Sequence, residues 1–171
     1  MLRYTLYEIR RSVLSFSSLF YTIIMPVGLY LLFGALQDYA KIKVADGNAA
    51  AYVMIGIALY GAISCTVSIS GLTVVENVAG WGRQLGLTPM NTGKYLLSKC
   101  CVAFIMAAVP ITAVNIVARM TKIDMPLKQQ LACAALSILC AMVFGFFGLA
   151  IGFLVPSESA VGIANGILVV F

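Results

Sequence analysis

Residues 49–75 read AAAYVMIGIALYGAISCTVSISGLTVV, a stretch without a single charged side chain. The core of a bilayer is roughly 30 Å thick and requires about 20 apolar residues of helix, each adding about 1.5 Å. The stretch is long enough to cross, and its glycines and serines allow a neighbouring helix to approach closely. We expect a transmembrane helix that packs against others. Its Ser and Thr hydroxyls also leave open a second interpretation, the lining of a substrate path.

Three further uncharged runs reach spanning length: Ser12–Leu36, Cys100–Ala118 and Leu131–Ser157. The composition agrees, because 62% of the 171 residues are hydrophobic and only 10% are charged, whereas soluble domains are about one quarter charged. The last run, Ser159–Phe171, has about 13 residues and is too short to cross. We therefore expect an all-α polytopic transmembrane helical bundle, with four full spans plus an incomplete fifth, in one domain over residues 1–171.

Several residues inside the runs carry more specific expectations. Pro26 should distort the first span, since neighbouring helices can satisfy the carbonyl that it leaves free. Asn115 lies deep in an apolar run and should find a hydrogen-bond partner on another helix. Gly148 and Gly152 have the GxxxG spacing of close helix contacts.

The chain opens with LRYTLYEIRRS at residues 2–12, where Leu2, Leu6 and Ile9 share one helical face. This pattern predicts a short helix on the membrane surface before the first span. The cations of the whole chain divide almost evenly between its two sides, so the three arginines of this opening stretch decide the orientation. They favour a cytoplasmic N-terminus.

The sequence offers little to support catalysis or cofactor binding. It contains no histidine, and its five cysteines form no CxxC pair. The residues Thr92-Gly93-Lys94 lack the earlier glycine and the following Ser or Thr of a phosphate-binding loop. The Lys and Arg residues are scattered in loops beside the spans, an arrangement that sets membrane topology rather than binding nucleic acid. We expect no catalytic residue, metal site, cofactor or nucleic-acid partner.

Residues 76–99, ENVAGWGRQLGLTPMNTGKYLLSK, separate two of the apolar runs and are the most unusual part of the chain. Thr88-Pro89 should end any preceding helix, since proline disfavours the α conformation of the residue before it. One helical face before that stop is apolar and consists of Val74, Val78, Trp81 and Leu85. This pattern predicts a short amphipathic helix at residues 74–89, outside the bilayer, which contacts a partner.

The pattern E-x-x-x-G-x-x-x-Q-L-x-x-T-P, at Glu76, Gly80, Gln84, Leu85, Thr88 and Pro89, resembles the cytoplasmic loop of ABC-2 type transporter permeases. Lys99, near the start of the next span, also resembles that family, as does the turn Pro156-Ser157-Glu158 between the last two runs. The chain departs from the family pattern at Arg83, where family members often have an acidic residue.

The resemblance implies the membrane-spanning permease subunit of an ATP-driven ABC exporter, with ATP hydrolysis on a separate cytoplasmic ABC ATPase subunit. It further implies a second permease subunit, in a homodimer or heterodimer, a multi-pass location in a cell membrane such as the bacterial plasma membrane, and a chain truncated before the end of span five. Residues 74–89 would be the coupling helix that binds the ATPase. Its partner-binding residues would be Glu76, Gly80, Trp81, Arg83, Gln84, Leu85, Thr88 and Pro89.

Two other classes remain open. A secondary transporter or channel driven by ion gradients would need ionisable residues at mid-membrane or inverted repeats, and the sequence has neither. A membrane-embedded enzyme or a scaffold protein is the third class, and an enzyme would need clustered His, Asp, Glu or Cys residues. A lipophilic, a peptide or a lipid-linked substrate fits the composition equally well.

Overall fold

The computed structural model describes residues 2–14, 19–44, 47–76, 80, 92–121, 123–155 and 159–170. Nearly all of them are helical, with one two-residue antiparallel strand pair that joins Lys43 to Asn48 and Val44 to Gly47. The elements are α1 (Leu2–Leu14), η1 (Phe20–Ile24), α3 (Met25–Tyr30), η2 (Leu31–Ala35), η3 (Asp38–Lys41), β1 (Lys43–Val44), β2 (Gly47–Asn48), α4 (Ala49–Glu76), α6 (Thr92–Met120), α7 (Leu127–Leu154) and α8 (Ser159–Val170).

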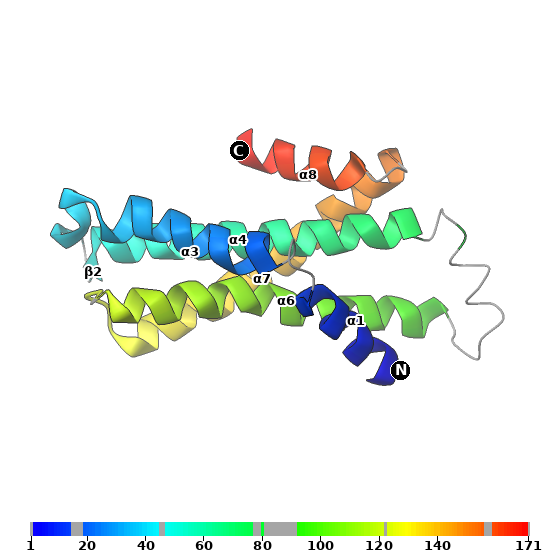
Figure 1. Cartoon of the computed structure of the whole chain (residues 1–171), viewed down its shortest axis with the longest axis horizontal. Helices are drawn as coiled ribbons and strands as arrows, with labels where there is room; N and C mark the ends of the chain where they lie inside the picture. Colours follow the sequence, from blue (N-terminus) through cyan, green and yellow to red (C-terminus); the bar gives the residue numbers. More distant parts are fainter. Residues whose placement is uncertain are drawn as a thin grey trace.

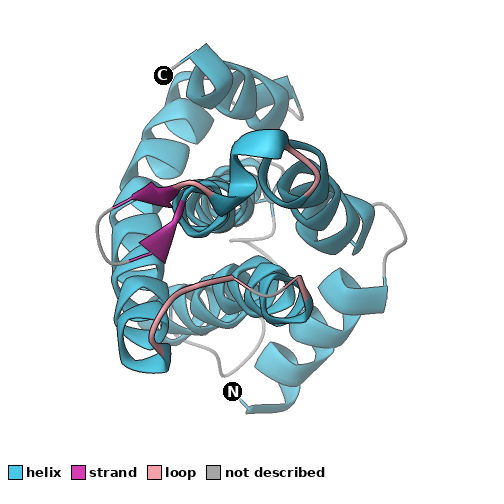
Figure 2. Ribbon diagram, turned by 90° about the vertical axis from the view of Figure 1, so that its left-hand side faces the viewer, coloured by secondary structure: helices cyan, strands magenta, loops and turns pink. Residues whose placement is uncertain are grey.

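Helix α4 is the centre of the bundle, because it contacts α3, α6, α7 and α8. It begins where the side-chain oxygen of Asn48 accepts a hydrogen bond from the backbone N–H of Ala51, which satisfies one donor of the first turn. Figure 1 shows α6 returning beside α4 and α8 lying along its other side. The strand pair lies at one end of the bundle, the hairpin end, which faces the viewer in Figure 2. Glu76 and Thr92 mark the opposite end, the loop end.

Glycine residues bring α4 and α7 into backbone contact. A Cβ atom added to Gly148 would lie 2.5 Å from the carbonyl oxygen of Val67, and one added to Gly152 would lie 2.9 Å from Cβ of Val74. Only a residue without a side chain permits such an approach. The expected GxxxG contact in this helix is therefore confirmed, with α4 as the partner.

Gly61 of α4 lies where three helices converge. A Cβ added there would meet Pro110 of α6 and Pro26 of α3, each at 3.1 Å. The two prolines thus contact the same point of the central helix. The expectation that residues 49–75 pack closely against other helices is confirmed at this position.

Many of the most deeply buried residues are alanines, whereas many large apolar residues lie on the outside of the bundle. Alanines at 58, 62, 107, 118 and 141 are nearly completely buried. Along α7, by contrast, the outward side is bulky and exposed and carries Leu139, Val143, Phe146 and Phe153. This distribution suits lipid, where helix association depends on close packing rather than on burial of apolar area from water.

Three helices in the described part of the chain are long and apolar enough to cross a membrane: Ala49–Glu76, Leu97–Met120 and Leu127–Leu154. The expectation of four full spans plus an incomplete fifth therefore holds only in part. Instead of one span from Ser12 to Leu36, the structure has a shorter apolar helical stretch, Phe20–Ala35, and residues 12–14 belong to α1. The second shorter stretch, Ser159–Val169, is the expected incomplete one.

Pro26 lies at the start of α3, directly after the π-helical turn η1. There the N–H of Met25 bonds to the carbonyl of Phe20, five residues back. Proline has no N–H to donate, and wider turns of this kind commonly accommodate such an interruption. The distortion expected at Pro26 thus takes the form of a π turn.

A polar group at the hairpin end joins α6 to α7. The side chain of Gln130, which is buried, donates to Oδ1 of Asn115 at 2.7 Å and accepts from Nε of Arg119 at 2.7 Å. The expected partner of Asn115 on another helix is therefore Gln130. Such bonds satisfy polar atoms that lipid cannot.

The contact between α4 and α7 yields a testable prediction. We expect Gly148→Ala to destabilise the bundle by about 1 to 3 kcal/mol, because the new methyl group would force two backbones apart. The matched control is Gly56→Ala in α4, since nothing lies within 4 Å of a Cβ added there. Thermal unfolding in detergent would measure both variants. Equal midpoints for the two would mean that the close α4–α7 contact is absent.

Candidate functional site

An ion-pair cluster, formed by Glu8, Glu76, Tyr95 and Lys99, lies at the loop end of the bundle. Lys99 of α6 is only 7% exposed. Its Nζ lies 2.8 Å from Oε2 of Glu76, the last residue of α4, and 2.5 Å from Oε1 of Glu8 in α1. The hydroxyl of Tyr95, one turn before Lys99, also donates to Oε2 of Glu76 at 3.3 Å. One buried lysine therefore joins three helices.

Helix α1 reaches this cluster through its polar face. Thr5 and Ser98 share a hydrogen bond of 2.6 Å between their hydroxyls, next to the contact of Glu8 with Lys99. Leu6 is 58% exposed. The apolar pattern of the sequence predicted the helix itself, and the structure adds that polar residues hold it to α6.

The electrostatics of the cluster depend on mutual pairing. Removing charges from water is unfavourable by several kcal/mol per ion, which close pairing and further hydrogen bonds must offset. Lys99 has both: two carboxylates accept from its ammonium group, and the ring of Tyr95 lies 5.6 Å away. Oε2 of Glu8 is buried and has no hydrogen-bond partner within the described residues. Lys99 is therefore the counter-ion that offsets the burial of both carboxylates.

The residues expected to bind a partner are only partly within the described segments. Glu76 ends α4, and Val74 packs inside the bundle against Gly152 of α7. Gly80 has a φ angle of +100°, a conformation that favours glycine. The remaining ones, Trp81, Arg83, Gln84, Leu85, Thr88 and Pro89, lie outside the described residues, so the predicted helix at 74–89 stays a prediction.

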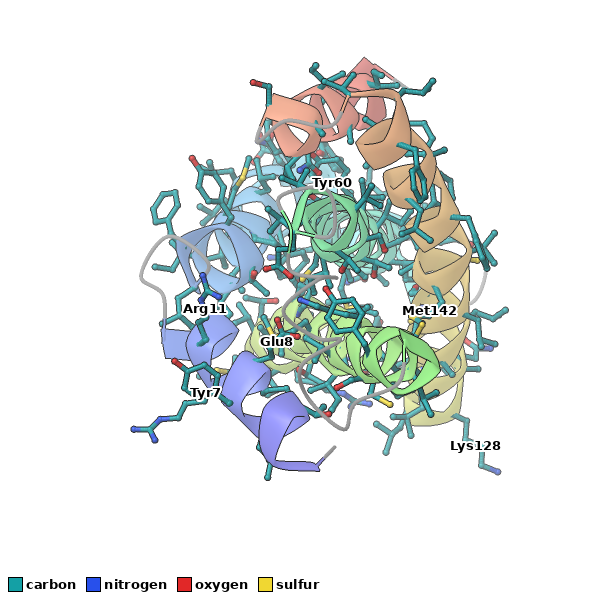
Figure 3. All side chains as sticks on the ribbon, turned by 90° about the vertical axis from the view of Figure 1, so that its right-hand side faces the viewer. Tyr7, Glu8, Arg11, Tyr60, Lys128 and Met142 are labelled. Carbon is teal, nitrogen blue, oxygen red and sulfur yellow. The ribbon has the colours of Figure 1, made fainter. Side chains whose placement is uncertain are left out.

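A cavity of about 830 Å³ opens beside the ion-pair cluster and extends along α4. Glu8, Glu76 and Lys99 line it at the loop end, while its apolar walls come from α3, α4, α6 and α8. Figure 3 looks into the bundle from the loop end and shows Glu8 pointing toward its centre.

The middle of the cavity carries uncharged polar groups. Ser64 of α4 donates to Oδ1 of Asn165 in α8 at 2.7 Å, and the amide nitrogen of Asn165 donates to the hydroxyl of Ser68 at 2.9 Å. All three residues line the cavity. The serines of α4 therefore both join two helices and face an open space, so the two interpretations of their role are compatible.

Sequence analysis did not identify Glu8 and Tyr95 as parts of a site. The sequence does indicate that Lys99 needs an anionic partner, because it lies at the start of an apolar span. It does not indicate that Glu8 is this partner, since the two residues are 91 positions apart.

The ion-pair cluster yields a second prediction. We expect Lys99→Met to lower the free energy of unfolding by about 3 kcal/mol, because it leaves two carboxylates without their counter-ion. Adding Glu8→Gln and Glu76→Gln should restore most of that loss. The control is Lys128→Met, at an exposed site, with an effect within about 0.5 kcal/mol. Denaturant unfolding in detergent would measure all variants, and failure of the triple variant to recover would contradict a charge-based role.

Comparison with known proteins agrees with this architecture. The sequence profile of the ABC-2 type transporter family matches residues 2–171, nearly the whole chain. Comparisons with curated proteins and with solved structures return no match. The resemblance in the loop after α4 is thereby confirmed at the level of the family. The chain belongs to the ABC-2 type transporter family, as a multi-pass membrane permease domain without the ATPase.

Proposed function

We propose that the chain is the permease subunit of an ATP-driven exporter, and that residues 74–89 couple it to a separate cytoplasmic ATPase. Permeases of the ABC-2 type typically pair with an ABC ATPase. A second permease subunit, identical or different, would complete the membrane part. The observation that carries the proposal is the ion pair between Glu76 and Lys99.

That pair joins α4 to α6, the two described helices that flank the proposed coupling segment. Glu76 is the last residue of α4, and Lys99 lies near the start of α6, the next described helix. Because the ion pair joins α4 to α6, a force applied through the segment would act on both helices together. Since α4 contacts α3, α6, α7 and α8, movement of its end would reach most of the bundle.

The cavity supports a transport role. Its walls combine apolar side chains with the serine and asparagine groups of α4 and α8. Sites for small molecules are mostly apolar with a few placed polar groups. We propose that it forms part of the substrate path, for a lipophilic, peptide or lipid-linked molecule.

Transport driven by an ion gradient receives less support. Proton and ion relays use ionisable residues deep in the membrane. In the long helices that the structure describes, the charged residues lie near helix ends: Glu76, Lys94, Lys99, Arg119 and Lys128.

We further propose that the loop end faces the cytoplasm of a bacterial plasma membrane and the hairpin end faces outside. The three arginines of α1 support this orientation.

In a cysteine-free background, Arg83→Cys and Lys94→Cys should be labelled only from the cytoplasm, and Lys43→Cys and Lys128→Cys only from outside. A membrane-impermeant maleimide measures this when it is applied to intact cells for the outer side and to permeabilised cells for the cytoplasmic side. Cytoplasmic labelling at position 43 or 128 would reverse the orientation.

The coupling role predicts the effect of three substitutions. We expect Trp81→Ala and Leu85→Ala to weaken ATPase binding about 30-fold or more, since truncating an interface anchor typically removes about 2 kcal/mol. Arg83→Glu should also weaken it, more at low salt than at high salt if the contact is exposed. Co-purification of the complete permease with its ATPase, at matched expression, is the measurement.

Two exposed residues at the hairpin end serve as matched controls, Leu127→Ala for the leucine and Lys128→Glu for the arginine. Neither should change co-purification. If Trp81 only anchors the chain in the membrane interface, its loss would reduce membrane yield and leave the complex intact. Undiminished co-purification of all three coupling variants would exclude residues 74–89 as the coupling element.

A further inference from the structure

The cavity beside the ion-pair cluster has a different chemistry at its loop end than along its length. Glu8, Arg11, Glu76 and Lys99 line the loop end, whereas apolar side chains of α3, α4, α6 and α8 form most of the remaining wall. Its volume of about 830 Å³ is in the range of sites that enclose a drug-sized molecule. A molecule that fills it would therefore have a polar head at the loop end and an apolar body.

The charges at the loop end of the cavity do not balance within the ion-pair cluster. Glu8 and Glu76 contribute two carboxylates, and Lys99 contributes one ammonium group. Arg11 is exposed and forms no ion pair with Glu8 among the described residues. An exposed charge is screened by water and salt far more than a buried one. The cluster consequently keeps one negative charge in excess.

One oxygen atom of the cluster also lacks a partner. Oε1 of Glu8 accepts a hydrogen bond from Lys99, but Oε2 is buried and has no hydrogen-bond partner within the described residues. Glu8 lines the cavity, and Figure 3 shows it pointing toward the centre of the bundle. The terminal torsion of a glutamate is soft, so a small rotation of the carboxylate brings this oxygen to a donor in the cavity. The site therefore lacks a hydrogen-bond donor as well as a positive charge.

We infer that the cavity binds an amphiphile with a protonated amine, whose ammonium group donates to Oε2 of Glu8 and whose apolar body lies along α4. A protonated amine supplies both a positive charge and a donor, and charge-assisted hydrogen bonds are the strong ones. This inference rests on the proposed role of the cavity as part of the substrate path. It narrows the substrate from lipophilic molecules in general to cationic ones, with Glu8 as the residue that selects the head group.

An anionic amphiphile is the competing occupant, because Arg11 and Lys99 line the same end of the cavity. Lys99, however, already donates to the carboxylates of Glu8 and Glu76. An anion beside Lys99 would lie close to the same two carboxylates, and like charges that share a site repel. Only the exposed Arg11 would then favour it. The observations thus favour the cation.

Three fluorescent probes with the same dansyl body and linker test the choice of head group. Monodansylcadaverine carries a primary ammonium group, its N-acetyl derivative is neutral, and its N-succinyl derivative ends in a carboxylate. The full-length chain is reconstituted in nanodiscs of phosphatidylcholine, which has no net charge. The dissociation constant of each probe is measured after subtraction of the signal from empty discs.

Each probe is compared between the parent chain and Glu8→Gln, so that its partition into lipid cancels. We expect Glu8→Gln to weaken binding of the ammonium probe about tenfold or more, as for loss of a hydrogen bond between charged groups, and to change binding of the neutral probe by less than about twofold. Glutamine keeps an oxygen that accepts from Lys99, and the thermal midpoint of the variant checks that the bundle is intact. Equal effects on the two probes would overturn the inference.

Arg11→Gln tests the same inference without altering Glu8. Because it removes a like charge from the loop end, it should leave binding of the ammonium probe unchanged or strengthen it. Tighter binding of the carboxylate probe than of the ammonium probe in the parent chain, together with loss of that binding in Arg11→Gln, would assign the cavity to an anion and overturn the inference.

A change in the wall of the cavity separates this inference from the proposed substrate path. Gly162 lines the cavity, and nothing lies within 4 Å of a Cβ added there. Gly162→Phe should therefore weaken the ammonium and neutral probes alike. If it does so while Glu8→Gln spares the ammonium probe, the cavity binds lipophilic molecules and only the assigned head group is wrong. If no probe responds to Gly162→Phe, the inference and the proposed substrate path both fail.

Discussion

The pairing of Lys99 with Glu8 and Glu76 is the interaction that organises the loop end of the bundle. A lysine that is 7% exposed would be strongly unfavourable without close anionic partners. Its two partners come from different helices, so satisfying one ammonium group also fixes α1 and the end of α4 relative to α6. The same electrostatic requirement positions α1, places charged groups beside the cavity and joins α4 to α6, the two helices that flank the proposed coupling segment.

The rest of the bundle follows from packing rather than charge. In lipid, burying apolar area gives little advantage, so helices associate where their backbones can approach. Gly148 and Gly152 provide that approach between α4 and α7, and Gly61 provides it toward two prolines. The amide groups of Gln130 and Asn165 then satisfy polar atoms between helices. Helix α4 thus packs closely against α7 and also borders the cavity.

Much of this fold was predictable, because uncharged runs of spanning length have few other solutions. Residues 49–75 correspond almost residue for residue to α4, which ends one position later at Glu76. The α6 helix begins earlier than the run at Cys100, since polar residues such as Ser98 and Lys99 continue it and find partners. The run that begins at Ser12 did not show where α1 ends, because residues 12–14 are as free of charge as the helical stretch Phe20–Ala35.

The site was predictable only in part. The resemblance around Glu76 and Lys99 indicated a functional loop, and these two residues do form a pair. The third partner depends on the rotation of α1. Apolar periodicity described only the face with Leu2, Leu6 and Ile9, whereas hydrogen bonds of Thr5 and Glu8 to α6 determine which way the helix turns.

The central claim is that the pair between Glu76 and Lys99 holds the coupling segment in the position that the ATPase binds. A double-mutant cycle tests it directly, with the dissociation constant of the ATPase measured for Glu76→Gln, Lys99→Gln and the double variant. We expect each single change to weaken binding and the double change to weaken it no further, with an interaction energy of about 1 to 3 kcal/mol. Unchanged dissociation constants, or effects that add within about 0.5 kcal/mol, would contradict it.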